Sequence, residues 1–245
     1  MDKMMYVAMS AARQVMIKQG TNNHNLANIN TTGFKADIDS FKSMPVYGPG
    51  HPGRVYSEDS RSGIDHTEGQ LISTGSALDI AVNGDGFIAV QNEDGSEAYT
   101  RDGSLRVTAQ GMLVTSAGHP VMGEGGPITL SPYDDLLIGS DGTITIHPLG
   151  QAGGELAVID RIKLVNPEKD TVERSKNGLF TTANDDEPAD ASVTLATESL
   201  ETSNVNSVAA LVNMIDLSRQ FEAQVKMMSA AEDNDVAAAQ LLKMS

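Results

Sequence analysis

Histidines and clustered carboxylates are the side chains of this sequence whose types could hold a metal ion or exchange protons. Zinc hydrolases place two histidines one helical turn apart. No two of the five histidines have that spacing, and we expect each to be a solvated loop residue: His24, His51, His66, His119 and His147. The acidic runs at 185–187 and 233–235 lack the glycine and terminal glutamate of a calcium loop. The sequence therefore predicts no metal site.

Phosphate-binding and nucleophilic motifs are also missing from the sequence. Gly84-Asp85-Gly86 is rich in glycine, but no Lys-Ser or Lys-Thr pair follows it and β-prone residues flank it. A hairpin turn is the favoured interpretation. The chain has no cysteine and no Gly-x-Ser-x-Gly elbow. We therefore expect no catalytic residue, no cofactor and no small-molecule substrate, and we predict that the protein is not an enzyme.

The charge of the chain limits the classes of partner that the protein is expected to bind. The formal net charge is −16, which repels phosphate backbones and anionic lipid surfaces, so nucleic acid is not an expected partner. The N-terminal region is broken by Ser10, Arg13 and Gln14, and no stretch approaches the roughly 20 apolar residues of a spanning helix. We expect no membrane insertion and no cleaved signal peptide.

The strongest positional pattern lies near the C-terminus. Over residues 204–242, apolar side chains recur three or four residues apart, which is typical of an amphipathic helix. The Thr202-Ser203-Asn204 cluster is expected to cap its start. A helix of this length measures about 55–60 Å, more than one side of a domain this size could cover. Part of its apolar stripe must therefore face another helix.

The N-terminal region has the same spacing. Apolar residues predict a helix from Asp2 to about Asn28, and the asparagine-rich run after it predicts an end near Asn28 or Asn30, with Gly33 in the exit turn. We expect the apolar residues of both terminal helices to form an assembly interface: Met4, Ala8, Ala11, Val15, Leu26, Val205, Val208, Leu211, Val212, Ile215, Phe221, Val225 and Met228.

The middle of the chain is predicted to form antiparallel β-structure. All nine prolines and all 23 glycines lie between Gly20 and Pro188, and Asp-Gly or Asn-Gly pairs that favour hairpin turns separate short β-prone runs. We expect strands at 78–82, 87–91, 98–100, 105–108, 112–115, 128–130, 136–138, 143–146 and 158–165. The predicted fold class is α+β: terminal helices paired as a coiled-coil-like hairpin and a central antiparallel all-β domain. The expected ranges are 1–44 for the N-terminal helix and signature turn, 45–75 for an extended connector, 76–197 for the β domain and 198–245 for the C-terminal helix.

Several motifs resemble those of the bacterial flagellar rod and hook family. Its N-terminal signature is matched by Asn25, Leu26, Ala27 and Asn28, followed by Thr32-Gly33-Phe34-Lys35, although the family more often has Asn at His24 and Pro at Thr32. Family motifs continue in order at 78–82, 84–87, 99–103 and 113–115. The stretches 161–167, 177–180, 203–206 and 214–222 are closer to the proximal-rod branch than to distal rod or hook proteins. The resemblance thins only at 46–66, 133–157 and 183–196.

The resemblance implies a function in assembly. It suggests a structural subunit of the flagellar proximal rod that polymerises through its terminal helices into the periplasmic drive shaft. The implied partners are proximal and distal rod proteins and the flagellar export apparatus, with export from the cytoplasm without a cleaved signal peptide. It also implies terminal helices that order only on assembly.

Two alternatives remain open. One is a distal rod or hook subunit, against which the short 45–75 connector argues. The other is a soluble antiparallel β-sheet binding module whose terminal helices pack within the same chain.

Overall fold

The computed structural model describes residues 4–45, 55–149, 156–175, 177–184 and 186–243, and its α+β architecture confirms the predicted fold class. The chain forms two compact units. The helical unit comprises 1–28, 37–63 and 205–245, and the β unit comprises 29–36 and 64–204. The expected connector, 45–75, is thus divided between them, because residues up to 63 belong to the helical unit and residues from 64 onward belong to the β unit.

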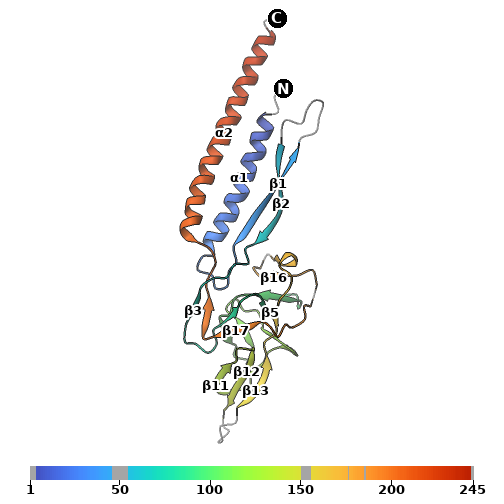
Figure 1. Cartoon of the computed structure of the whole chain (residues 1–245), viewed down its shortest axis with the longest axis vertical. Coiled ribbons are helices and arrows are strands. Elements are labelled where there is room, and N and C mark those ends of the chain that lie inside the picture. The colour runs from blue at the N-terminus through green and yellow to red at the C-terminus, as the bar shows by residue number, and fades with distance from the viewer. Residues whose placement is uncertain (1–3, 46–54, 150–155, 176, 185, 244–245) are drawn as a thin grey trace. The chain divides into compact units, whose positions relative to one another are not determined.

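The helical unit contains both terminal helices. Helix α1 (Met4–Ala27) lies antiparallel to α2 (Ser207–Lys243), beside a two-stranded sheet of β1 (Asp37–Pro45) and β2 (Val55–Ile64) (Figure 1). The Asn22 side chain donates a 2.9 Å hydrogen bond to the carbonyl of Ala210, which joins the end of α1 to the start of α2. Helix α2 has 37 residues against 24 in α1, so it continues beyond Met4 (Figure 1).

The ends of the helices follow local hydrogen bonding. As predicted, α1 ends close to Asn28, whose side-chain amide donates to the carbonyl of His24 at 2.9 Å. Helix α2 begins later than expected, because Asn206 and not the 202–204 cluster caps it. The Oδ1 atom of Asn206 accepts from the amide of Ala209 at 3.0 Å. The predicted cap was therefore wrong, since the side chain of Asn204 is used elsewhere.

The β unit is built from short antiparallel strands. Its largest sheet has the order β14-β5-β6-β16-β15, a second has the order β11-β12-β13, and the remaining strands form the pairs β3–β18, β4–β17, β7–β8 and β9–β10. The bounds are β3 Leu71–Ser73, β4 Ile80–Asn83, β5 Phe87–Gln91, β6 Glu97–Thr100, β7 Leu105–Val107, β8 Leu113–Thr115, β9 Met122–Gly123, β10 Gly126–Pro127, β11 Tyr133–Ile138, β12 Thr143–Pro148, β13 Ala157–Arg161, β14 Leu164–Val165, β15 Glu173–Arg174, β16 Phe180–Thr181, β17 Thr194–Thr197 and β18 Ser199–Glu201, with a 3-10 turn at Lys169–Thr171.

The predicted turn glycines explain why these strands reverse. Gly95 between β5 and β6 and Gly142 between β11 and β12 both have φ of 86°, a region that favours glycine. Gly103 is needed for a different reason, because a Cβ there would lie 1.6 Å from the carbonyl oxygen of Ile80. Two strand predictions were wrong in detail. Residues 128–130 make only a bridge at Thr129, and 158–165 divides into β13 and β14 around Ile162.

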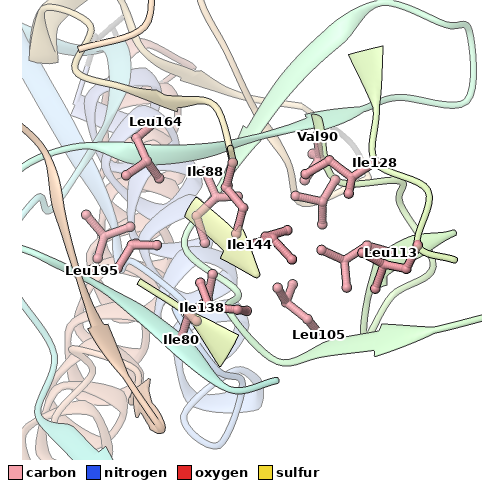
Figure 2. Packing of buried hydrophobic residues seen from close by; sticks show 14 of the residues in the cluster. Ile80, Ile88, Val90, Leu105, Leu113, Ile128, Ile138, Ile144, Leu164 and Leu195 are labelled. Carbon is pink, nitrogen blue, oxygen red and sulfur yellow. The ribbon is translucent and has the colours of Figure 1, made fainter. Parts of the chain in front are cut away.

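Two clusters of buried side chains form the core of the β unit, and the larger one is aliphatic. Ile80, Ile88, Val90, Leu113 and Ile144 are each 0% exposed and come from four different strands, β4, β5, β8 and β12 (Figure 2). A second cluster is centred on Phe87, Tyr99 and Phe180, with Phe87 and Phe180 5.1 Å apart between ring centroids. Strands too short to be stable alone are therefore held by a shared core.

Truncation on the two faces of one sheet tests this packing. Ile144 points into the core, whereas Leu137 on the neighbouring strand is 51% exposed. We predict that Ile144→Ala lowers the free energy of unfolding by about 2–5 kcal/mol, and Leu137→Ala by less than about 0.5 kcal/mol. Urea unfolding followed by circular dichroism measures both, and equal losses would contradict this assignment of faces.

Candidate assembly interface and the buried ion cluster

A heptad-spaced row on α2 is partly or fully buried in the helical unit. Its residues recur four and three apart, as in a coiled-coil seam: Ala210, Met214, Leu217, Phe221, Gln224, Met228 and Ala231. The matching row on α1 is Ala8, Ala12, Val15, Gln19, Asn22 and Leu26. We call these two rows the closed seams. Each seam contains two alanines, and larger apolar side chains such as Val15, Leu217 and Phe221 are also buried or partly buried there.

Another side of α1 holds strand β1. The Asn25 side chain donates to the carbonyl of Asp37 at 2.9 Å and accepts from the Asp37 amide at 2.9 Å. Thr21 donates to Asp39 at 2.9 Å, and His24 lies 2.7 Å from the Asp37 carboxylate. The signature residue Asn25 thus acts as a strand partner for the backbone that follows the helix.

The predicted interface residues divide into three groups in the single chain. Ala8 and Val15 are buried, and Ala11, Leu26, Val205, Phe221 and Met228 are partly buried. Five remain exposed: Val208 (69%), Leu211 (49%), Val212 (51%), Ile215 (55%) and Val225 (43%). The side chain of Met4 lies outside the described residues. Sequence spacing found the amphipathic helix, but it did not separate the face that contacts α1 from the face left in water.

Sequence reasoning missed the exposed face of α1. Tyr6, Met9 and Met16 are 58%, 55% and 61% exposed. They were overlooked because methionine and tyrosine interrupt a stripe that was traced through smaller apolar residues. A clustering of methionines in the terminal helices was the available signal.

Three charged side chains meet in the interior of the β unit. The Glu201 carboxylate accepts from Lys35 Nζ at 2.7 Å through Oε1 and from the Arg101 guanidinium at 3.1 Å through Oε2. All three side chains are at most 3% exposed. Lys35 also donates to the carbonyl of Thr67 at 2.8 Å, and Arg101 to that of Gly84 at 2.7 Å. We call Lys35, Arg101 and Glu201 the ion cluster.

Two glycines allow the backbone to approach this cluster. The amide of Gly33 donates to the carbonyl of Glu201 and the amide of Gly69 to its Oε1 atom, both at 2.8 Å. Gly33 has φ of 66°, as expected for the exit turn, and a Cβ there would lie 2.2 Å from the backbone of Arg101. At Gly69 a Cβ would lie 1.9 Å from the carbonyl oxygen of Thr202. Neither position has room for a side chain.

Asn204 and Phe34 extend the same network. Asn204 accepts from the amide of Ala36 at 2.7 Å and donates to the carbonyl of Asp65 at 2.9 Å, which is why it does not cap α2. Arg174 stacks on Phe34, with its guanidinium carbon 4.6 Å from the ring centroid, and donates to the carbonyl of Lys35. Residues 33–36, which follow α1 in sequence, and 201–204, which precede α2, are therefore fixed side by side within the β unit.

Opposing effects act on the ammonium group of Lys35. Burial lowers its pKa, because the charged form loses hydration, while the hydrogen bond and the charge of Glu201 act in the opposite direction. Loss of Glu201 would remove the two largest effects that raise the pKa of Lys35, so this pKa would fall further. The carboxylate is thus what permits a charged lysine in this interior.

The histidines do not gather at a site. His24 lies in α1 and His147 in β12, so the loop prediction was wrong for both; His51 lies outside the described residues. His66 packs edge-on against Phe87, and burial lowers its pKa. Within the described residues, no group of three or more His, Asp or Glu side chains could hold a metal ion, and no helix has the length and apolarity needed to cross a membrane.

Comparison with known proteins agrees with this architecture. Residues 81–146 match the model of the flagellar hook protein FlgE/F/G D1 domain, and residues 196–241 match that of the flagellar basal body rod FlgEFG protein C-terminal region. The first match covers core strands of the β unit, and the second covers β18 and nearly all of α2.

Relatives match over most or all of the chain. The flagellar basal-body rod protein FlgF of Escherichia coli is 40% identical, with 100% of both chains covered. FlgF of Caulobacter vibrioides is 32% identical over 93% of each chain. FlgG of Buchnera aphidicola subsp. Baizongia pistaciae is 31% identical over 85% of this chain and 88% of its own.

The chain belongs to the flagellar rod and hook protein family. Within that family it is similar to the FlgF rod proteins over its whole length, which confirms the branch indicated by the sequence. It is a structural subunit of the flagellar basal-body rod that interacts with other rod and hook components, and the prediction that it is not an enzyme is confirmed by the structural role of the family.

Removal of the central carboxylate tests the ion cluster. Glu201→Gln leaves two buried cations without their counter-charge, so we predict a loss of about 3–5 kcal/mol in the free energy of unfolding. Glu124→Gln, at an exposed position, is the matched control and should change it by less than about 0.5 kcal/mol. Thermal and urea unfolding measure both. A Glu201→Gln variant as stable as the control would show that the cluster does not stabilise the β unit.

Proposed function

We propose that this subunit belongs to the proximal rod and polymerises through its terminal helices into the periplasm-spanning drive shaft. The observation that supports this most directly is the exposed apolar face of α2, where Val208, Leu211, Val212 and Ile215 are 49–69% exposed. Four neighbouring aliphatic side chains on one helix form a patch that a partner surface explains. The mechanism is assembly, with no chemical step.

The size of the unburied face fits a multivalent contact. Complete burial of a Val, Leu or Ile side chain contributes about 1.5–3 kcal/mol, so a half-exposed one retains roughly 1 kcal/mol to be gained. Four such side chains give about 4 kcal/mol, which does not exceed the entropy cost of association of about 4–15 kcal/mol. A subunit that contacts several neighbours, as in a tube wall, adds these small gains together.

The composition of the closed seams supports ordering of the helices on assembly. Ala8, Ala12 and Ala210 contribute little buried area at the helix contact. Four of the thirteen residues in the closed seams are alanines, and each of these gains less from packing to offset the entropy of ordering than a larger apolar side chain would. We expect the terminal helices to become stable when neighbouring subunits cover their exposed faces.

The same proposal covers partners and location. Neighbouring proximal and distal rod proteins would supply the surfaces that cover the helices. The flagellar export apparatus would deliver the chain from the cytoplasm without cleavage of a signal peptide, to a rod in the periplasm. We expect no nucleic-acid partner and no membrane insertion.

Two other functions are less well supported. A β-sheet binding module with self-contained helices requires their apolar faces to be covered within the chain, yet the faces on α1 and α2 are open. A distal rod or hook subunit is disfavoured by the relatives, because the FlgF proteins of Escherichia coli and Salmonella match the full chain at 40% identity, whereas FlgG of Buchnera covers 85% of it.

A single charge on the exposed face of α2 tests polymerisation. We predict that Ile215→Asp abolishes rod assembly and motility, because the carboxylate would have to be desolvated at the subunit contact. Asn213→Asp, also exposed but on the opposite side of α2, should assemble normally. Swimming assays and electron microscopy of basal bodies measure the outcome, with circular dichroism to show that the β unit remains folded. Normal rods in Ile215→Asp would overturn the proposal.

A further inference from the structure

A second heptad row runs along α2, one residue on from its closed seam. Every residue in it is exposed, and spacings of three and four alternate throughout: Val208, Leu211, Ile215, Ser218, Glu222, Val225, Ser229, Glu232 and Val236. A step of one residue rotates by about 100° around a helix, so this row faces away from α1. We call it the open seam of α2. Sustained 3.5-residue spacing is the pattern of a surface that receives another helix.

Helix α1 has an equivalent row. It also lies one residue on from the closed seam of its helix, and every member is exposed: Tyr6, Met9, Arg13, Met16, Gly20 and Asn23. We call it the open seam of α1. The other side of α1 is occupied by β1 through Thr21 and Asn25. Each helix therefore has one heptad row that its own chain leaves uncovered.

The two open seams are complementary in charge. Arg13 lies between Met9 and Met16, and the described part of α1 contains Arg13 and Lys18 but no acidic residue. The open seam of α2 carries Glu222 and Glu232 among aliphatic and small residues. Flexible methionines pack well against Val, Leu and Ile, and an exposed Arg–Glu pair favours one register and one partner more than it adds affinity.

We propose that the open seam of α1 in one copy docks onto the open seam of α2 in a neighbouring copy of the same chain. The two seams cannot meet within one molecule, because the helices already contact each other through rows about 100° away. The contact uses two different surfaces, so it is heterologous and leaves a free seam at each end to continue the assembly. This inference rests on the proposed polymerisation and specifies which surfaces meet.

Disulfide cross-linking tests the contact directly, because the chain has no cysteine of its own. Two copies of different size, one with Met9→Cys or Met16→Cys and the other with Leu211→Cys, Ile215→Cys or Val225→Cys, are expressed together in the host lacking the gene. Isolated basal bodies are oxidised, and the mixed dimer is measured by electrophoresis. The matched control replaces the second set with Asn213→Cys.

We expect at least one seam pair to give about tenfold more mixed dimer than the Asn213→Cys control, the ratio that corresponds to 1.4 kcal/mol of preference. Normal rods without excess mixed dimer, or with cross-links only to other rod proteins, would overturn the inference and leave helix-mediated polymerisation standing.

Charge exchange covers the case in which cysteine variants do not assemble. Arg13→Glu and Glu222→Arg should each reduce motility, and the double variant should restore it, because the pair is reformed with reversed charges. Single variants without effect, or a double variant as defective as the singles, would overturn the inference. Ile215→Asp still tests polymerisation separately.

Discussion

An amphipathic helix in water is stable only when its apolar side is covered, and α2 has more apolar side than its own chain covers. One heptad row packs against α1, and a second row stays exposed from Val208 to Val236. The closed seams bury or partly bury Val15, Leu217 and Phe221, yet the apolar residues of the open seam of α2 remain uncovered. This imbalance connects the fold to the proposed function, because the apolar surface of α2 would be covered only when neighbouring subunits pack against it.

The β unit holds together two chain segments that are far apart in sequence, residues 33–36 and 201–204. A buried glutamate with two buried cations is costly unless each group is fully hydrogen-bonded. Lys35, Arg101 and Glu201 are hydrogen-bonded to one another and to backbone groups at Thr67, Gly69 and Gly84, and only the buried Nε of Arg101 within this cluster has no hydrogen-bond partner among the described residues. Packing of aliphatic side chains could stabilise the unit equally well, but directional hydrogen bonds also fix the positions of residues 33–36 and 201–204.

Local physics made much of this predictable from the sequence. Three- and four-residue spacing located both helices, and Asp-Gly and Asn-Gly pairs located the hairpins, because these features depend on near neighbours. The strands β3, β17 and β18 were missed, since they are short and pair across more than 110 residues. The ion cluster was missed for the same reason: Lys35 and Arg101 lie in recognisable motifs, but their shared partner, Glu201, is distant in sequence. The wrong cap at 202–204 arose because Asn204 has better partners at Ala36 and Asp65.

Amide hydrogen exchange of α2, compared between the purified single chain and isolated basal bodies, tests the central claim most directly. If neighbours supply the missing burial, amides across 208–228 exchange rapidly in the single chain and slowly in the assembled rod, while Ile88, Leu113 and Ile144 in the β unit are protected in both. Slow exchange across 208–228 in the single chain would contradict the account, because the helices would then be stable without any neighbour.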